Sequence, residues 1–146
     1  LSEGRGTTLP FHLNGAPYID PYAWADALNA FDFPGVKFRH AFFQPTFCEF
    51  AGQSCGGVQI HVTDREAFTP VIVGIAMVKT AHDMYPDHFQ WRQNDYEYEF
   101  GRNPFDIVCG NAKFRKAIES GVSFDGFPFD IGLGEFVEFR RKYLLY

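Results

Sequence analysis

The stretch Gly57–Asp64 reads GVQIHVTD, and its alternation of apolar and polar side chains predicts a β-strand with one buried face. The apolar members, which we expect to face the core, are Val58, Ile60 and Val62. The polar members, which share the other face, are Gln59, His61 and Thr63. A strand of this kind belongs to a sheet with a covered side and an open side.

Helix signals stand on both sides of this strand. Thr69 followed by Pro70 begins an apolar run that predicts a helix to about Tyr85, because proline fits the first helical turn. The same signal at Asp20 and Pro21 predicts an earlier helix, which ends before the turn residues Pro34 and Gly35.

The rest of the chain completes the pattern. Residues 36–43 alternate and predict a second strand, whereas the glycines and prolines of residues 1–19 predict irregular structure. Two shorter helices are predicted downstream, one capped by Asn111 and one beginning near Gly132. Because no strand–helix–strand rhythm repeats, we expect an α+β fold, a single domain with a small mixed sheet packed with several helices.

Composition excludes several classes of function. The chain has 146 residues and a net charge of −5, so a phosphate-neutralising basic surface is not expected and we predict no nucleic-acid partner. The apolar runs at residues 71–78 and 143–146 are far shorter than the ~20 residues of a membrane span, so we expect no membrane insertion. Residues 1–6 lack a signal peptide and an initiating Met, which favours a part of a longer protein.

Aromatic residues are abundant, with 18 Phe, 7 Tyr and 2 Trp. Those that the predicted helical and strand patterns do not bury cluster in residues 42–50 and 89–105. Exposed aromatic rings there would suit a sugar-binding platform or a domain interface.

The three cysteines, Cys48, Cys55 and Cys109, cannot pair completely. Cys48 and Cys55 are close enough in sequence to bridge across a loop, or both stay reduced. With His61 they show no zinc-binding spacing, so we expect no metal and no cofactor.

The segment Glu3–Thr8, EGRGTT, is the first candidate binding element. It has the glycines of a phosphate loop but neither the preceding strand nor the Gly-Lys-Ser/Thr ending. Its carboxylate, guanidinium and hydroxyls suit a polar or carboxylate-bearing ligand, because arginine binds a carboxylate through two parallel hydrogen bonds. The alternative is an ordinary capped turn.

The polar face of the strand is the second candidate. Gln59 and His61 would line a cleft there, and the alternative is the solvated side of a half-buried sheet. Glycoside hydrolysis needs two carboxylates roughly 5–10 Å apart, and Glu3, Glu49 and Asp64 are the acidic candidates without a spacing that singles out a pair.

Several separated motifs together resemble one known family. They are Ser2–Phe11 followed by Gly15–Tyr18, then Pro45–Phe47, then Gly57–Asp64, and the ending Arg141–Tyr146. In this order and spacing they are similar to the C-terminal domain of bacterial exo-β-N-acetylmuramidases of the NamZ type, long catalogued as the domain of unknown function DUF1343.

This resemblance implies a two-domain glycosidase in which residues 1–146 are the C-terminal α+β domain and an N-terminal Rossmann-like catalytic domain is absent from the chain. Such enzymes release N-acetylmuramic acid from the non-reducing ends of peptidoglycan fragments during cell-wall turnover, in a cleft between the domains. The catalytic acid would lie in the N-terminal domain, so no catalytic residue is expected in this chain, and the isolated domain should be inactive. The expected partners are muramyl sugars and that N-terminal domain, in a bacterial periplasmic or secreted protein.

The resemblance also suggests which residues bind the sugar. We expect Arg5 to pair with the lactyl carboxylate of muramic acid, Glu3 to bind sugar hydroxyls or orient Arg5, and Thr7 to act in the same loop. The remaining expected contacts come from Gln59 and His61 lining the cleft, and from Phe47 or Tyr18 stacking on the pyranose ring. The alternative function is a non-catalytic carbohydrate-binding or protein-interaction module.

Overall fold

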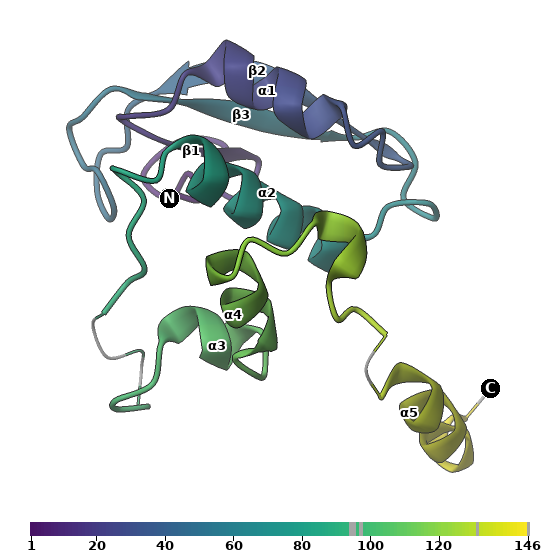
Figure 1. The fold of residues 1–146 in the computed structure, drawn as a ribbon. Coiled ribbons are helices and arrows are strands. Elements are labelled where there is room, and N and C mark those ends of the chain that lie inside the picture. Colours follow the sequence, from purple (N-terminus) through teal and green to yellow (C-terminus); the bar gives the residue numbers. More distant parts are fainter. Residues whose placement is uncertain (94–95, 97, 131, 146) are drawn as a thin grey trace. The chain divides into compact units, whose positions relative to one another are not determined.

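The computed structural model describes residues 1–93, 96, 98–130 and 132–145 (Figure 1). The chain divides into two compact units, residues 1–90 and 91–146, each with its own packing. None of the described helices is long and apolar enough to cross a membrane.

The first unit is built on a three-stranded sheet. Its strands are β1 (Leu13–Ala16), β2 (Val36–Phe43) and β3 (Cys55–Val62), in the order β1-β3-β2. β3 pairs antiparallel with both neighbours, matching Gln59 to Leu13 on one side and to Arg39 on the other. The α+β class is therefore confirmed, and the sheet is antiparallel in both pairings where the sequence predicted mixed directions. The reason is the loop at 44–54, which returns the chain from β2 to β3 without the crossover helix that parallel neighbours need.

Strand β1 lies inside the segment that the sequence predicted to be irregular. Its four residues include Gly15, and glycine is depleted in strands, so no local signal marks it. The strand forms because β3 approaches it very closely: a Cβ on Gly57 would lie 2.0 Å from the Asn14 carbonyl oxygen. Pairing with β3, rather than propensity, makes this segment extended.

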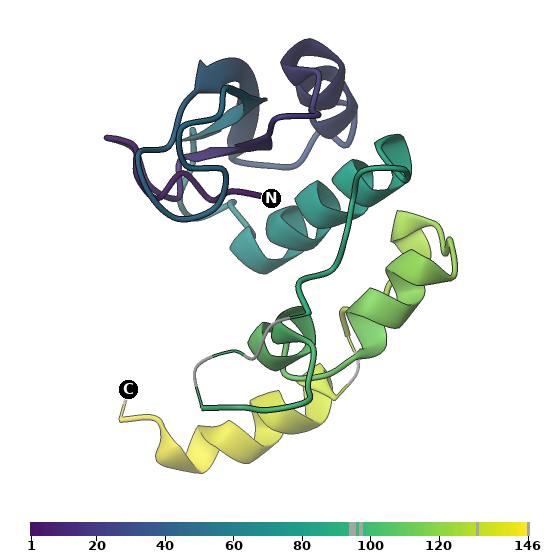
Figure 2. The ribbon, with the colours of Figure 1, turned by 90° about the vertical axis from the view of Figure 1, so that its left-hand side faces the viewer.

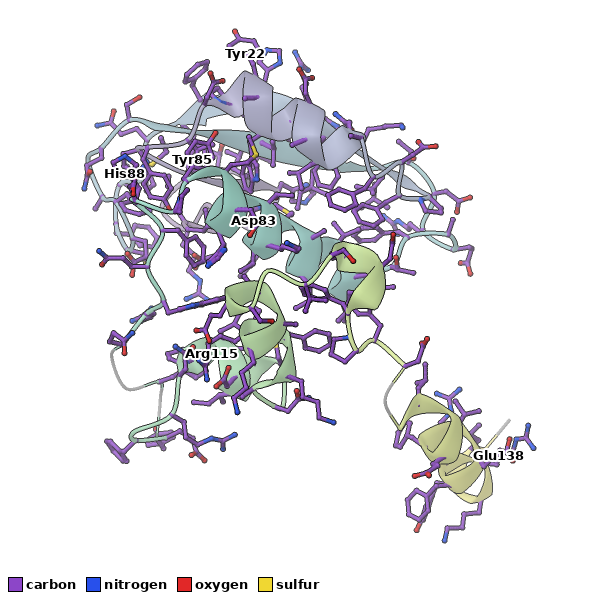
Figure 3. All side chains as sticks on the ribbon, viewed as in Figure 1. Tyr22, Asp83, Tyr85, His88, Arg115 and Glu138 are labelled. Atoms are coloured by element: carbon purple, nitrogen blue, oxygen red, sulfur yellow. The ribbon has the colours of Figure 1, made fainter. Side chains whose placement is uncertain are left out.

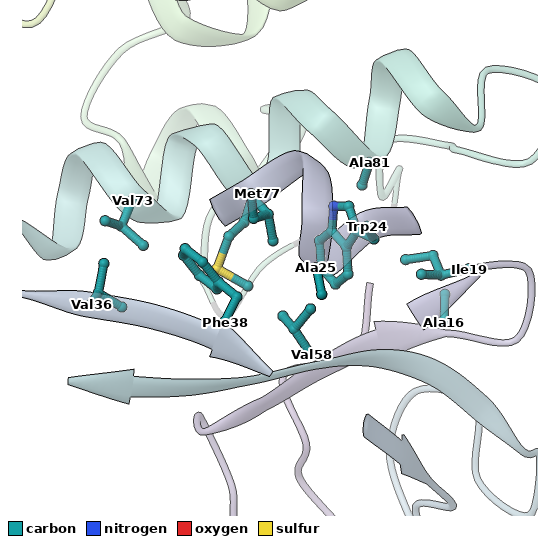
Figure 4. Close-up of a cluster of buried hydrophobic side chains, with 11 residues drawn as sticks. Ala16, Ile19, Trp24, Ala25, Val36, Phe38, Val58, Val73, Met77 and Ala81 are labelled. Carbon is teal, nitrogen blue, oxygen red and sulfur yellow. The ribbon is translucent and has the colours of Figure 1, made fainter. Parts of the chain in front are cut away.

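Two helices cover one face of the sheet (Figures 2 and 4). Helix α1 spans Pro21–Asn29 and α2 spans Pro70–Met84, as the cap-and-proline signals predicted. Asp20 caps α1 by accepting hydrogen bonds from the backbone N–H groups of Tyr22, at 2.9 Å, and of Ala23, at 3.2 Å.

The core lies between these helices and the sheet. Its buried members come from all layers and include Trp24, Leu28, Phe38, Val58, Val73 and Met77 (Figure 4). The indole of Trp24 is fully buried and donates a hydrogen bond from Nε1 to Thr80 Oγ1 at 2.9 Å. This bond satisfies the polar atom of the largest buried side chain.

The second unit is helical in its described part. It contains α3 (Pro104–Val108), α4 (Lys113–Glu119), α5 (Leu133–Arg140) and two single 3₁₀ turns at Phe124–Gly126 and Arg141–Tyr143. The predicted helix starts near Asn111 and Gly132 are confirmed, and the Asn111 side chain accepts a hydrogen bond from the Lys113 N–H at 2.8 Å. Helix α3 lies in the stretch that the sequence left without an assignment.

An ion-pair network joins α3 to α4 (Figure 3). Arg115 donates from Nε and Nη2 to the two carboxylate oxygens of Asp106, both at 2.8 Å, and from Nη1 to Glu119 at 3.0 Å. Hydrogen bonds from Arg115 to these carboxylates raise the pKa of its guanidinium above the ordinary value. A cluster of aromatic rings packs around α4 as well, namely Phe114, Phe124, Phe127 and Phe129.

Candidate functional site

Two loops of the first unit contact each other through Gly6 and Thr46. The Gly6 carbonyl accepts hydrogen bonds from the backbone N–H and from the hydroxyl of Thr46, both at 2.9 Å. Gly6 has a φ of +82°, and a Cβ there would lie 2.7 Å from the Phe47 carbonyl oxygen. The contact therefore needs glycine, and it brings the segment of Glu3, Arg5 and Thr7 next to the loop that carries Phe47.

Glu3 and Arg5 form an ion pair. Arg5 Nε lies 3.0 Å from Glu3 Oε1, and the guanidinium lies over the ring of Phe11, 5.6 Å from its centroid. The Arg5 side chain is 57% exposed. The Glu3 carboxylate therefore lies beside the Arg5 guanidinium, and the roles predicted for Glu3 and Arg5 in sugar binding stay predictions.

Thr7 closes its own loop. Its hydroxyl donates to the Gly4 carbonyl at 2.6 Å and accepts from the Leu9 N–H at 3.2 Å. This is a local turn of the kind that serine and threonine side chains form. The sugar-binding role of Thr7 stays a prediction.

Three residues other than glycine adopt a positive φ in these two loops: Phe11 at 65°, Cys48 at 64° and Phe50 at 60°. Each such conformation costs free energy that the surrounding structure must supply, about 1–3 kcal/mol per residue. Backbone held in this way tends to occur at ligand sites, which makes this pair of loops a candidate part of one.

A hollow of about 630 Å³ lies next to the first of these loops, which contributes Leu9 and His12 to its lining, where β1 ends and β3 continues. The last residue pair between β1 and β3 is Leu13 with Gln59, and one further bond, from the Ile60 N–H to the His12 carbonyl at 2.9 Å, follows it. The edge of β3 at His61 and Val62 runs past the end of β1. The residues that line the hollow are Leu9, His12, Gln59, Ile60, His61, Val62, Arg65 and Phe68. They come from the loop before β1, from β3 itself and from the turn that follows β3.

The lining combines apolar walls with groups that form hydrogen bonds. Gln59 and His61, both predicted from the strand alternation, contribute to it. His61 Nε2 is buried and has no hydrogen-bond partner among the described residues. Because an unsatisfied buried nitrogen costs roughly 1–3 kcal/mol, an oxygen of a ligand placed there would stabilise the protein.

Sequence reasoning missed His12 and Arg65. His12 lies directly before β1, the strand that no local pattern revealed. Arg65 follows the Asp64 turn, in which Asp64 Oδ1 accepts hydrogen bonds from the N–H groups of Glu66, at 2.9 Å, and Ala67, at 3.3 Å. A basic residue just past the end of a strand with a polar face was the signal that could have identified Arg65.

Tyr18 lies elsewhere, beyond the other end of β1. Its ring stacks on His88, with centroids 5.5 Å apart, and contacts Tyr85, with centroids 5.8 Å apart. Figure 3 labels these two partners, Tyr85 and His88. Burial raises the pKa of the Tyr18 hydroxyl, and the Tyr85 hydroxyl accepts a hydrogen bond from the Asp20 N–H at 3.1 Å. The structure therefore brings Gln59 and His61 into the hollow, places Glu3, Arg5, Thr7 and Phe47 in the adjoining loops, and separates Tyr18 from both.

A second charged cluster lies at the end of α2 (Figure 3). Asp83 accepts a hydrogen bond from Lys79 Nζ, and its other oxygen lies 2.9 Å from His82 Nδ1. Burial acts to raise the pKa of Asp83, but the bonds from Lys79 and His82 together outweigh it, so the pKa is lower than usual. These groups bind one another, and this cluster contributes nothing to the hollow.

Metal and disulfide chemistry find little support in the described part of the chain. Cys48 is exposed, Cys55 is buried, and both are free, as is Cys109. Among the described residues, no three His, Cys, Asp or Glu side chains are placed to hold a metal ion.

Comparison with known proteins gives three concordant matches. Residues 1–146 match the family model described as "Exo-beta-N-acetylmuramidase NamZ, C-terminal". The chain is 41% identical over 148 residues to the peptidoglycan β-N-acetylmuramidase NamZ of Bacillus subtilis (strain 168), covering all of this chain and 34% of that protein. The crystal structure of a DUF1343 family protein from Bacteroides fragilis has the same fold, with a TM-score of 0.79 at 24% identity over 99% of this chain and 38% of the other. The chain thus spans about a third of the length of these proteins.

Proposed function

Because this chain belongs to the family of NamZ C-terminal domains, we propose that it is the substrate-binding part of a peptidoglycan glycoside hydrolase. The full protein would release N-acetylmuramic acid from the non-reducing ends of glycan fragments, as the family resemblance implies. The observation that carries the proposal is the hollow beside β3. Its mixture of apolar walls and hydrogen-bonding groups fits a sugar, which has apolar C–H faces and polar edges.

We assign the polar contacts with the sugar and the apolar contacts with its ring to different residues of the hollow. Gln59, with an amide that both donates and accepts, suits sugar hydroxyls or an acetamido group, and His61 Nε2 supplies another contact. Leu9 and Phe68 provide apolar surface for the ring. The Glu3–Arg5 pair belongs to the same loop as Leu9, so we assign it to the border of the same surface, with Phe47 as an exposed ring beside it.

Catalysis is assigned to another part of the polypeptide. Hydrolysis of a glycosidic bond uses two carboxyl groups roughly 5–10 Å apart, and the residues lining the hollow include no Asp or Glu. The relatives carry about two thirds of their length outside the matched region. We propose that an N-terminal Rossmann-like domain supplies the acid and that the sugar is bound between it and the hollow.

Separate expression of the two parts tests this division. Residues 1–146 and the remainder of the full-length protein are assayed alone and mixed, and release of N-acetylmuramic acid from a muramyl disaccharide is measured. We expect no turnover from residues 1–146 alone and recovery of turnover on mixing. Turnover by residues 1–146 alone would identify an autonomous hydrolase.

The same experiment addresses the alternative of a non-catalytic module. Full turnover by the remainder alone, together with binding of the disaccharide by residues 1–146 alone, would identify a carbohydrate-binding module. Because peptidoglycan lies outside the cytoplasmic membrane, we also propose a periplasmic or secreted location, which cell fractionation with an antibody against this domain would test.

A further inference from the structure

The hollow beside β3 is lined by an arginine that is not ion-paired within the described part of the chain. Arg65 lines it and forms no salt bridge with any described residue. The other ionisable members of the lining are His12 and His61, and the lining has no carboxylate. An arginine whose five N–H donors lack a protein acceptor, facing a cavity, is a ready binding group for an anion.

A second observation shows that the hollow is built for a polar ligand. His61 Nε2 is buried and lacks a hydrogen-bond partner among the described residues. Leaving such an atom unsatisfied is unfavourable, so an oxygen atom that reached it would stabilise the site. His61 lies within β3 and Arg65 lies in the turn that follows it, and both residues line the hollow.

The apolar part of the lining restricts the class of anion. Leu9, Ile60, Val62 and Phe68 form walls that give no hydrogen bonds from their side chains. A phosphate or sulfate would leave those walls in contact with water. A carboxylate on a short apolar arm matches both halves of the lining, because its oxygens reach the guanidinium while its carbon atoms contact the walls.

We propose that Arg65 binds the lactyl carboxylate that distinguishes N-acetylmuramic acid from N-acetylglucosamine. The proposal rests on the function proposed above and identifies the residue that makes the hollow specific for muramic acid. The lactyl ether adds to the sugar a carboxylate and a methyl group, which correspond to the charged and the apolar parts of the lining.

Arg5 is the other candidate for this role, since from the sequence we expect Arg5 to pair with the lactyl carboxylate of muramic acid. In the structure Arg5 is paired with Glu3 at 3.0 Å and does not line the hollow. A ligand carboxylate at Arg5 would lie close to the negative charge of Glu3, which weakens binding. Arg65 is flanked in the chain by Asp64 and Glu66, but it forms an ion pair with neither of them and with no other described residue.

The test compares a charged ligand with its neutral analogue. Binding of N-acetylmuramic acid and of its lactyl amide to the full-length protein is measured by calorimetry, and kcat/KM is measured for muramyl disaccharide with the acid and with the amide. The wild-type protein should prefer the acid. Arg65→Gln should reduce that preference roughly tenfold, the lower end for a hydrogen bond to a charged group because Arg65 is exposed. Arg65→Lys should retain part of it, because charge remains while the two-pronged geometry is lost.

Two variants serve as comparisons. Arg39→Gln removes an exposed arginine from β2, opposite Gln59 but outside the lining, and should leave the preference unchanged. Arg5→Gln tests the rival residue: whatever it does to overall affinity, it should keep the preference for the acid over the amide. Loss of affinity for acid and amide alike in Arg65→Gln would indicate a structural role and overturn the proposal.

The remaining outcomes separate this proposal from the one on which it rests. If the preference disappears in Arg5→Gln and persists in Arg65→Gln, the carboxylate is bound by Arg5. If it persists in every variant, or if the wild type does not prefer the acid, Arg65 is not the carboxylate ligand while the hydrolase function stands. If the wild-type protein neither binds nor hydrolyses muramyl ligands, the proposed function fails, and this proposal fails with it.

Discussion

Replacing Gly6 with alanine should separate the loop before β1 from the loop that carries Thr46 and Phe47. Gly6 adopts a φ of +82°, where a residue with a Cβ is less stable than glycine by about 1–2 kcal/mol. The added Cβ would also lie 2.7 Å from the Phe47 carbonyl oxygen and 2.9 Å from the Thr46 nitrogen, both backbone atoms that cannot rotate away. The loops must therefore move apart.

That movement would break the two hydrogen bonds that Thr46 donates to the Gly6 carbonyl, both at 2.9 Å. At about 0.5–1.5 kcal/mol each, their loss adds about 1–3 kcal/mol. We expect the free energy of unfolding to fall by about 2–5 kcal/mol in all, a large part of the stability of a typical domain, which is about 5–15 kcal/mol.

Gly52→Ala is the matched control. Gly52 lies in the second of the two loops and has a φ of +75°, but a Cβ there meets nothing within 4 Å. Gly52→Ala should therefore lower the free energy of unfolding only through the unfavourable positive φ, by about 1–2 kcal/mol. The difference between the variants isolates the contact between the loops.

Urea unfolding, followed by the fluorescence of Trp24, measures both variants. Trp24 is fully buried in the first unit, and a Trp91→Phe background removes the other tryptophan. The unfolding midpoint should fall further for Gly6→Ala than for Gly52→Ala. Equal midpoints would refute the reasoning, because they would show that breaking the contact between the loops does not change the free energy of unfolding.

Three further variants test other contacts. Thr80→Val removes the acceptor of the Trp24 indole N–H and should lower the free energy of unfolding by about 1–3 kcal/mol in urea titrations, while Thr80→Ser should restore most of it. Arg115→Met leaves the carboxylate of Asp106, whose side chain is 12% exposed, without its cation. It should lower the free energy of unfolding of the second unit by about 1–3 kcal/mol, which a thermal melt records as a lower midpoint. An unchanged midpoint would mean that water compensates the carboxylate as well as Arg115 does. Asp83→Asn should be less stable than wild type near neutral pH, because the pKa of Asp83 is lower in the folded state and its carboxylate therefore stabilises the fold. The difference should be full above the unfolded pKa of about 4, shrink as the pH falls below it, and vanish only below the lower folded pKa. A difference independent of pH in guanidinium titrations would contradict this account of Asp83.

Helix starts and the two long strands were predictable because their signals are local. Asp20 caps α1 with its own side chain, and β2 covers the residues 36–43 that alternate in the sequence. Strand β1 was not predictable, since Gly15 disfavours an extended conformation and only the pairing with β3 imposes it. The exposure of Phe42, at 64%, agrees with the expectation that aromatic rings of residues 42–50 lie outside the buried patterns.

The candidate site divides in the same way. Gln59 and His61 were identified because they share one face of a strand, a property of their own sequence. His12 and Arg65 were missed because His12 precedes β1 and Arg65 follows β3. Only the pairing of these two strands brings both residues to the hollow, and no local sequence pattern predicts that pairing. Tyr18 was grouped with the site from its motif, and the structure packs its ring against His88 instead.

The sequence by itself determined the α+β class, the helix caps and the family, because each depends on residue types at short or recurring spacing. Tertiary structure alone decided where the hollow lies and which cation lines it. His12 and Arg65 are far apart along the chain, and the register that places Leu13 opposite Gln59 ends β1 where β3 continues. The free energy of that pairing comes from contacts between segments distant in sequence, which no local pattern of side chains contains.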